Sequence, residues 1–410
     1  MSKEKVITYK PSETYNLLKN IILANDKIIA GGGLPVSISV VGVHGIGKTT
    51  VIRELAQDMG RDFFKLNLAQ ITEPSELIGF YSKEYEMTKA DTKGKVETSW
   101  VTENMIPEYS SKGFTRGSQT RTSPCPPDWV VNLKEGGILC LDDFSRGNSL
   151  LMQSVMEICN EGTMIGWDLS AKKIQVILSE NPDDGEYNVQ SVDAAHGSRM
   201  AKVNMRWDAQ DWAARAEKIK LDERLINFVL WAPEFLENKK SDGISSSGNV
   251  SPRMMDKFFS LVSTIDDFEN HLDLISVYGG ITVGKDFVNK MNEFIGKRLD
   301  KLPIIDKLLK EYDLPTAKSQ LTLACGDAEK DPAGFKGATA AILATRMYNY
   351  VRFNSKDLSK DQIKRYLDLI LHSSFTNDQK FLMVKQTISC GNQFAQILAG
   401  DPRFIKYMTA

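Results

Sequence analysis

The chain carries a phosphate-binding motif, Gly42-Val43-His44-Gly45-Ile46-Gly47-Lys48-Thr49, within its 410 residues. The motif matches the pattern G-x-x-x-x-G-K-S/T at every fixed position. An apolar run over residues 37–41 leads into it and predicts a buried parallel strand, and residues 50–56 predict the start of a helix. A turn of this kind places several backbone N–H groups and the positive end of a helix dipole around one anion. The motif therefore predicts an α/β fold in which this turn binds phosphate.

Each fixed residue of the motif has a chemical reason to be there. Gly42 and Gly47 allow backbone angles that a side chain would forbid. Lys48 is expected to reach the β- and γ-phosphates of bound ATP, and the hydroxyl of Thr49 is expected to hold Mg²⁺. His44 occupies a variable position and is assigned no chemistry. The predicted nucleotide-binding residues are Gly42, Gly45, Ile46, Gly47, Lys48, Thr49 and Thr50.

A second apolar run ends in a pair of acids. Residues 137–143 predict a buried strand with Asp142 and Asp143 at its carboxyl end, the edge at which open α/β sheets bind ligands. Asp142 is expected to hold the Mg²⁺ shell together with Thr49. Asp143 is expected to be the base that polarises an attacking water molecule. Acids at strand ends are often simple caps, but the phosphate loop earlier in the chain favours the catalytic interpretation.

A third strand end carries an amide. Residues 174–178 predict a buried strand that leads to Asn181, which precedes a proline. The Asn181 amide can touch the γ-phosphate or the attacking water. The alternative is that Asn before Pro is only turn chemistry. A fifth short strand is expected over residues 201–205, directly after Arg199 and Met200.

The composition limits the class of protein. The chain is 42% hydrophobic and 25% charged, with a formal net charge of −2, which gives no general attraction to nucleic acid or to anionic membranes. No apolar run reaches the roughly 20 residues of a membrane span, and the first residues do not resemble a signal peptide. The five cysteines are far apart and form no C-x-x-C motif, so neither a zinc site nor a disulfide framework is indicated. These features favour a cytoplasmic protein.

The pattern along the chain suggests three domains. An α/β domain is expected over residues 1–205, with a polar insert at about residues 82–127 that lacks a core pattern. Such a segment is either functional or a solvated excursion. From residue 206 on, the helical period prevails. We expect helices over residues 206–300 and an all-helical region over residues 301–410. Two capping boxes, at residues 359–362 and 376–379, mark helix starts in that region.

The order of these elements resembles an AAA+ ATPase, and within that class the MoxR-like branch found in bacteria and phages. The resemblance covers about residues 35–265. It implies a five-stranded parallel sheet flanked by helices, a helical lid over residues 206–300, and a C-terminal helical region. The residues that carry it are Pro74-Ser75-Glu76-Leu77-Ile78-Gly79, Leu141-Asp142-Asp143-Phe144-Ser145-Arg146, Asn181-Pro182 with Tyr187, Ser198-Arg199-Met200 and Ser251-Pro252-Arg253.

The resemblance also implies roles for single residues. The phosphate loop corresponds to Walker A, Asp142 and Asp143 to Walker B, and Asn181 to the first sensor. Arg199 corresponds to the arginine finger and Arg253 to the second sensor. In such families the finger acts on the nucleotide of a neighbouring subunit, which implies a ring, commonly a hexamer, that uses ATP and Mg²⁺. The alternative for Arg199 is a surface ion-pair residue.

The chain departs from the family pattern at two positions. Asp143 stands where the usual catalytic residue is glutamate, and its shorter side chain implies slower or differently arranged water activation. Met200 stands where phenylalanine is usual and keeps an apolar anchor. The insert at residues 82–127 falls where this branch carries elements that face the ring axis, so the region around Trp100 is a candidate for the pore side.

Three functions are compatible with the sequence. The favoured one is an ATP-driven machine that remodels a protein partner, by resemblance a separately encoded von Willebrand A-type protein. The second is a nucleic-acid motor or loader, for which Lys112, Arg116 and Arg121 of the insert are candidate channel residues. The third is a nucleotide-gated scaffold in which Asp143 marks weak hydrolysis.

Overall fold

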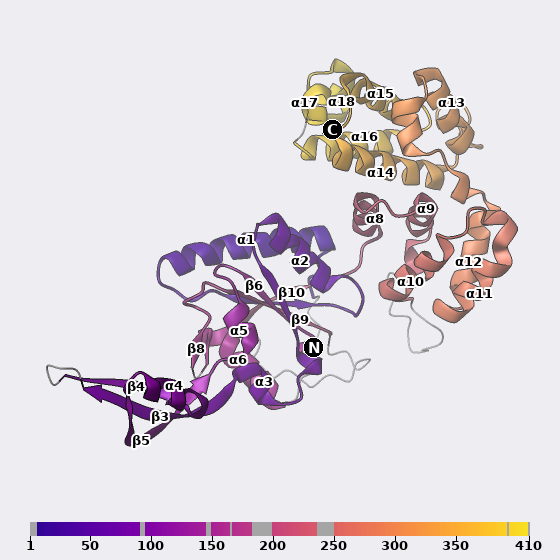
Figure 1. Ribbon diagram of the computed structural model, residues 1–410. Coiled ribbons are helices and arrows are strands. Elements are labelled where there is room, and N and C mark those ends of the chain that lie inside the picture. The colour runs from indigo at the N-terminus through magenta and orange to yellow at the C-terminus, as the bar shows by residue number, and fades with distance from the viewer. Residues whose placement is uncertain are drawn as a thin grey trace, which may run out of the picture. The chain divides into compact units, whose positions relative to one another are not determined.

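We describe the protein from a computed structural model, in which residues 6–90, 95–144, 149–164, 166–182, 199–235, 250–391 and 393–408 are described. The chain forms two compact units, Met1–Arg206 and Trp207–Ala410, and each is described by itself (Figure 1). The domain limits expected from the sequence, at residues 205 and 300, stay predictions. Within the described ranges, every helix is too short or too polar to cross a lipid bilayer.

The first unit is built on a parallel sheet of five strands in the order β10-β1-β9-β6-β2. The strands are β1 (Ser37–Val41), β2 (Phe63–Asn67), β6 (Ile138–Asp142), β9 (Gln175–Glu180) and β10 (Met200–Asn204). This confirms the predicted α/β P-loop NTPase class with its five-stranded parallel sheet. The strand expected over residues 174–178 continues to Glu180, because Ser179 and Glu180 still pair with β1.

Helices and a small ribbon complete this α/β core. They are α1 (Pro11–Ala30), α2 (Lys48–Asp58), α3 (Pro74–Ile78), α5 (Asp128–Asn132), α6 (Ser149–Glu161) and the turn η1 (Leu68–Gln70), with β7 (Thr163–Met164) paired to β8 (Trp167–Asp168). Every residue of β6 and β9 is buried, as expected for parallel strands covered on both faces. One apolar cluster joins Leu139, Leu141 and Leu178 of the sheet to Leu151 and Val155 of α6.

The insert between α3 and α5 forms an antiparallel sheet of its own, in the order β4-β3-β5. Its elements are β3 (Phe80–Ala90), β4 (Val96–Thr102), η2 (Glu103–Met105), α4 (Ile106–Ser111) and β5 (Thr115–Cys125). No core pattern was recognised in this segment from the sequence. The structure has one, because Tyr85, Met87 and Val101 are buried on one face. Three apolar residues spread over two strands give too weak an alternation to be noticed.

Two tryptophans fix the base of this insert. The indole N–H of Trp129 donates to the carbonyl of Leu77 at 3.2 Å, and that of Trp167 donates to the carbonyl of Ile78 at 3.0 Å. The two rings meet edge to face with centroids 5.3 Å apart. At the next residue, Gly79 has φ of 98°, and a Cβ there would lie 2.1 Å from the carbonyl oxygen of Cys125. Only glycine therefore allows β3 to start beside the end of β5.

The second unit is helical throughout its described residues. Its helices are α8 (Ala209–Lys218), α9 (Glu223–Trp231), α10 (Pro252–Val262), α11 (Leu272–Thr282), α12 (Lys285–Gly296), α13 (Leu314–Cys325), α14 (Gly337–Asn354), α15 (Lys360–Ile370), α16 (Asn377–Ser389), α17 (Gln393–Ala399) and α18 (Ile405–Met408). Short turns are η4 (Pro233–Phe235), η5 (Glu269–His271), η6 (Leu299–Lys301), η7 (Lys307–Glu311) and η8 (Pro402–Phe404). The capping boxes predicted at Ser359 and Thr376 are confirmed.

A buried arginine joins three helices of this unit. Arg346 of α14 is 1% exposed, and its Nε donates to a carboxylate oxygen of Glu217 on α8 at 2.7 Å. Its other guanidinium nitrogens lie 3.0 Å from a carboxylate oxygen of Glu223 and 3.2 Å from the amide oxygen of Asn227, both on α9. Burial is the largest influence on Glu217 and raises the pKa of this carboxyl, although Arg346 lowers it. This network ties residues before position 300 to residues after it.

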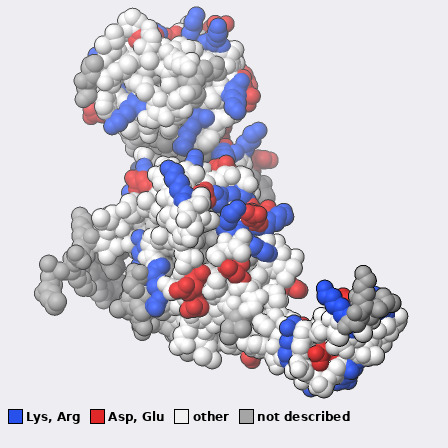
Figure 2. All heavy atoms as spheres, turned by 90° about the vertical axis from the view of Figure 1, so that its left-hand side faces the viewer, with Lys and Arg blue, Asp and Glu red and all other residues white. Residues whose placement is uncertain are grey.

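The surface carries both signs of charge. In Figure 2, Lys and Arg side chains lie among Asp and Glu side chains on the face that is drawn. This mixture agrees with the nearly balanced 51 basic and 53 acidic residues of the sequence. Mixed charge of this kind gives no extended field of one sign on that face.

Candidate nucleotide-binding site

The phosphate loop has the geometry of an anion-binding turn. It leads from β1 into α2, which begins at Lys48 with Gly47 as its N-cap. Gly45 and Gly47 have φ of 79° and 95°, the left-handed region that favours glycine. The N–H of Val51 donates to the carbonyl of Gly47 at 2.9 Å, so the helix is hydrogen-bonded from its first turn. The N–H groups before that turn are the ones that can bind a phosphate.

Gly42 is needed for packing and not, as the sequence suggested, for its backbone angle, because its φ is outside the left-handed region. A Cβ at this position would lie 2.6 Å from the Cδ1 of Ile46 and 2.6 Å from the carbonyl oxygen of Met205. Ile46 itself is buried, with 6% of its surface exposed. The loop is thus pressed against the chain that follows β10. Any larger residue at position 42 would push it away.

Lys48 connects the loop to the end of β9. Its ammonium donates to the carbonyls of Gly42 at 2.6 Å and Val43 at 3.1 Å, and to the side-chain oxygen of Asn181 at 3.1 Å. Lys48 is 8% exposed and Asn181 is 5% exposed. Two predicted site residues, far apart in the sequence, are therefore in direct contact. Their ammonium and amide groups lie where the loop would present a phosphate.

Thr49 and Asp142 also meet. The hydroxyl of Thr49 donates to the Oδ1 of Asp142 at 3.1 Å, across the gap between α2 and the end of β6. A hydroxyl and a carboxylate are hard oxygen donors of the kind that Mg²⁺ prefers, and Mg²⁺ sites commonly use one or two such groups together with substrate phosphates. The pair fits a Mg²⁺ ion by its chemistry and by its place beside the phosphate loop.

Asp142 has a further partner that the sequence analysis missed. The ammonium of Lys65 on β2 lies 2.7 Å from the Oδ2 of Asp142. Burial is the largest influence on Asp142 and raises its pKa, but hydrogen bonds from Lys65, Ser179 and Thr49 outweigh it and lower the pKa below its ordinary value. A lysine in the middle of an edge strand gives no sequence signal for this contact, because the contact depends on the pairing of two strands.

Asp143 follows with an unusual backbone. Its φ is 56°, in the left-handed region, which aspartate tolerates better than most residues. This conformation is a physical reason for aspartate at a position where the family pattern has glutamate. The role of Asp143 as a base stays a prediction.

Arg199 lies at the opposite edge of the sheet. The register pairs Met200 with Ser37 at the start of β1, whereas the phosphate loop follows Val41 at its end. Four residues of strand separate these positions, or about 13 Å at the usual rise of about 3.3 Å per residue. Arg199 is exposed there. As an arginine finger it would therefore contact the nucleotide of a neighbouring chain, and this role stays a prediction.

Arg253 belongs to the second unit. It is exposed on the first turn of α10, where the hydroxyl of Ser251 accepts a hydrogen bond from the N–H of Met254 at 3.2 Å. Ser251 is the N-cap of this helix, and Pro252 occupies its first position. The role of Arg253 as a second sensor stays a prediction. Four other residues of the family pattern, Ser145, Arg146, Tyr187 and Ser198, lie outside the described residues.

The basic residues of the insert have partners within the insert. Lys112 forms an ion pair with Glu108 at 2.6 Å. The guanidinium of Arg121 lies 2.8 Å from Glu84 and 4.7 Å from the centre of the Trp100 ring. Arg116 lies 4.2 Å from the centre of the Tyr85 ring. The three cations proposed from the sequence as channel residues are thus engaged in contacts that hold the insert together.

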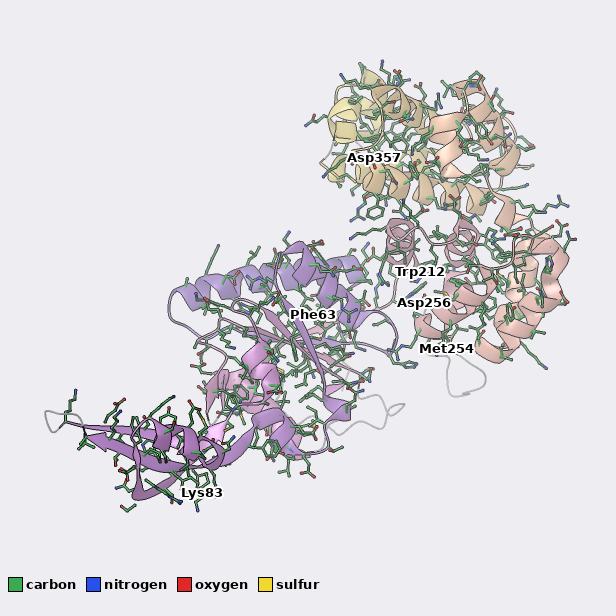
Figure 3. All side chains as sticks on the ribbon, in the orientation of Figure 1. Phe63, Lys83, Trp212, Met254, Asp256 and Asp357 are labelled. Atoms are coloured by element: carbon green, nitrogen blue, oxygen red, sulfur yellow. The ribbon has the colours of Figure 1, made fainter. Side chains whose placement is uncertain are left out.

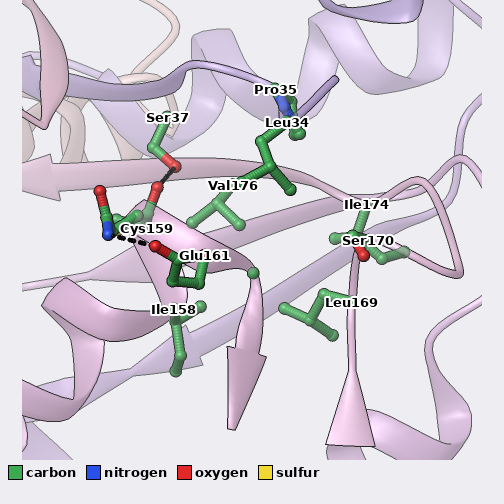
Figure 4. Close-up of a pocket in the computed structure, with 12 residues that line it drawn as sticks. Leu34, Pro35, Ser37, Ile158, Cys159, Glu161, Leu169, Ser170, Ile174 and Val176 are labelled. Atoms are coloured by element: carbon green, nitrogen blue, oxygen red, sulfur yellow. Dashed lines mark hydrogen bonds between the residues drawn. The ribbon is translucent and has the colours of Figure 1, made fainter. Parts of the chain in front are cut away.

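Arg53 and a pocket in the first unit do not belong to the site. Arg53 of α2 is placed over the ring of Phe63, which begins β2, at 5.3 Å from the ring centre (Figure 3). The pocket has a volume of only about 10 Å³ and is lined mainly by apolar surface, with Leu34, Leu169 and Val176 among its residues (Figure 4). Its wall includes the start of β1, so it is at the amino edge of the sheet and away from the phosphate loop.

Comparison with known proteins gives one family match. Residues 37–200 match the family model described as AAA domain, dynein-related subfamily. Proteins of this AAA+ class generally hydrolyse ATP with Mg²⁺ and generally form oligomeric rings. No curated protein matches the chain.

Several solved structures are similar to the chain at low identity. The RuvB Holliday junction branch migration motor of Thermotoga maritima is 12% identical with a TM-score of 0.33, and the match covers 75% of this chain and 80% of that chain. A point mutant of the same motor is 11% identical with a TM-score of 0.35, and covers 77% of this chain and 86% of that chain. At these TM-scores we infer nothing about this chain from them.

Proposed function

We propose that this chain, whose residues 37–200 match the model of a dynein-related AAA domain, is a MoxR-like ATPase that works in a ring, commonly of six subunits, to remodel a protein partner. The observation that carries the ATPase assignment is the contact set at the sheet edge. Lys48 touches Asn181, and Thr49 touches Asp142, so residues from three separate segments converge beside one anion-binding turn. Groups that converge in this way are typical of phosphoryl transfer, where catalysis is mostly positioning and charge stabilisation.

The residues of the chain divide the chemistry among themselves. The N–H groups of the loop and the ammonium of Lys48 would bind the β- and γ-phosphates and balance their charge. Thr49 and Asp142 would hold Mg²⁺, which when bound stabilises negative charge on the phosphate oxygens. Asp143 would accept a proton from the attacking water, while Asn181 orients that water. The oxygen of that water would bond to the γ-phosphorus as the bond from the γ-phosphorus to the bridging oxygen breaks, and ADP and inorganic phosphate would leave.

The place of Arg199 supports a ring. At the amino edge of its own sheet, this guanidinium cannot serve the site of its own chain at the other edge. Arg199 would instead act in trans, as an arginine finger, on a nucleotide bound by a neighbouring chain. Such fingers raise the rate of hydrolysis by about 10³- to 10⁵-fold. A ring in which each site borrows an arginine would make hydrolysis depend on assembly.

A protein partner is favoured over nucleic acid by the insert. Lys112 and Arg121 are paired with Glu108 and Glu84, which offsets part of the positive charge that the insert could offer to a phosphate backbone. Arg116 lies over the Tyr85 ring and keeps its charge. A separately encoded von Willebrand A-type protein is the partner class that the MoxR-like branch suggests. The region of Trp100 is proposed as the part of the insert that meets it.

The test is steady-state ATP hydrolysis of the purified protein at increasing concentration. We expect specific activity to rise as the ring forms, and Lys48→Ala and Arg199→Ala to remove it. Mixing Lys48→Ala with Arg199→Ala chains should restore part of the activity, because some sites then combine an intact loop with an intact finger. Full activity of Arg199→Ala as a dilute monomer would contradict the shared site. Strong stimulation by DNA would favour the motor instead.

A further inference from the structure

Asp142 is held from both of its carboxylate oxygens. Oδ1 accepts the hydroxyl of Thr49 at 3.1 Å, and Oδ2 lies 2.7 Å from the ammonium of Lys65. Thr49 comes from α2 and Lys65 from β2, so two different elements grip the two oxygens. The Asp142 side chain is 12% exposed. A carboxylate bound in this way cannot rotate without losing a contact.

Lys65 reaches this position along the edge of the sheet. In the pairing of β2 with β6, Lys65 stands beside Cys140, and Asn67 stands beside Asp142. The lysine side chain therefore extends two residues forward to meet the carboxylate. The other cation nearby, Arg53, has its guanidinium over the Phe63 ring at the far end of β2. Within the described residues, the ion pair of Asp142 is with Lys65.

We propose that Lys65 is a positioning residue for the Mg²⁺ site, which holds the Asp142 carboxylate turned toward Thr49. This inference rests on the proposed function. A fixed carboxylate loses less freedom when it binds a cation or a water of its shell, so the pair preorganises the site. Repulsion between the ammonium and the metal acts in the opposite direction. We expect the gain from orienting the Asp142 carboxylate to be larger than the cost of this repulsion.

The experiment measures binding of a fluorescent ADP analogue to the full chain in two buffers, one with Mg²⁺ and one with EDTA. Lys65→Met keeps the length of the side chain and removes its charge. We expect this variant to bind the analogue roughly tenfold more weakly in Mg²⁺, the usual loss when a partner of a metal ligand is removed. In EDTA its affinity should equal that of the wild type. Lys65→Arg should recover most of the loss in Mg²⁺.

A matched control is available at the other edge of the same sheet. Lys173 precedes β9 and forms an ion pair with Glu135 at 2.6 Å. Lys173→Met makes the same chemical change at a more exposed lysine–carboxylate pair, whose side chains are 58% and 63% exposed, without touching Asp142. We expect its affinity to be unchanged in both buffers. Equal losses for Lys65→Met and Lys173→Met would mean that the effect is general charge or stability, and would overturn the proposal.

The outcomes separate this inference from the function on which it rests. Unchanged or tighter binding of Lys65→Met in Mg²⁺ would overturn the positioning role and leave the ATPase assignment intact. Nucleotide binding by Lys65→Met that is weakened equally in Mg²⁺ and in EDTA would also overturn the positioning role and leave the ATPase assignment intact. A wild-type chain that binds no nucleotide in either buffer would instead overturn the proposed function, and this inference with it.

Discussion

Asp142 in the first unit and Glu217 in the second are similar in geometry and opposite in behaviour. Each side chain is 12% exposed, and each carboxylate lies 2.7 Å from a cationic nitrogen, that of Lys65 or of Arg346. Yet the pKa of Asp142 is lowered and that of Glu217 is raised. Distance to a cation and exposure therefore do not by themselves decide whether the pKa of a carboxyl is raised or lowered.

The difference comes from the remaining neighbours. Burial is the largest influence at both residues and raises both pKa values. At Asp142, hydrogen bonds from Lys65, Ser179 and Thr49 overcome it. At Glu217, Arg346 does not overcome it, and the charge of Glu223 adds to the rise. A carboxylate at a ligand site is kept charged by several donors, whereas a carboxylate in a closed network serves packing.

The largest effect is expected from breaking the closed network. Arg346→Met leaves Glu217 buried without its cation, which typically costs about 3–5 kcal/mol of the free energy of unfolding. Urea denaturation followed by circular dichroism would measure it. Arg403→Met is the control, because Arg403 is 51% exposed and its pair with Asp368 is of a kind that contributes about 0–1 kcal/mol. A smaller loss for Arg346→Met than for the control would refute the contrast.

A smaller effect is expected at the ligand site, and on a different property. Asp142→Asn should weaken binding of a nucleotide in Mg²⁺ by about 10- to 100-fold, or about 1.4–2.8 kcal/mol. Glu217→Gln should leave that affinity unchanged. The measurement is a fluorescent nucleotide titration of both variants at the same Mg²⁺ concentration. If Glu217→Gln also lost affinity, the two carboxylates would not have the separate roles that their surroundings indicate.

The smallest effect concerns pH. Because the folded-state pKa of Glu217 is raised, its contribution to stability is full below its ordinary value of 4.5 and is lost as pH rises through the folded pKa. For Asp142, with a lowered pKa, the contribution is full above 3.8 and is lost as pH falls. As pH rises from 4.5 toward 7, the wild type should lose stability relative to Glu217→Gln in urea denaturation. Parallel pH profiles of the two proteins would contradict the raised pKa.

Local patterns were sufficient for the sheet and for part of the site. The phosphate loop, Asp142 and Asn181 each stand at a strand end, and parallel strands bring such ends to one edge. The sequence therefore predicted which of these groups would meet, although not how closely. The capping boxes of α15 and α16 were equally predictable, because all of their residues lie within one turn of helix.

Contacts between strands and between distant helices were not predictable. Lys65 is an ordinary exposed lysine until the pairing of β2 with β6 places it near Asp142. Arg346 is one of many arginines in a helical region, and its three partners lie more than 100 residues earlier in the chain. The core of the insert was missed for a related reason, since Tyr85, Met87 and Val101 are brought together only after β3 and β4 pair.

The base of the insert has a mechanical consequence. The indole N–H groups of Trp129 and Trp167 donate to the last two carbonyls of α3. The backbone at Gly79 packs so closely against Cys125 that there is no space for a side chain. These contacts fix the base of the insert, so the described residues form no flexible hinge between α3 and β3. A force that acts on the far ends of β3 and β5 is therefore transmitted to α3 as a bending moment. Any displacement of α3 is, by the same geometry, magnified along the length of the two strands.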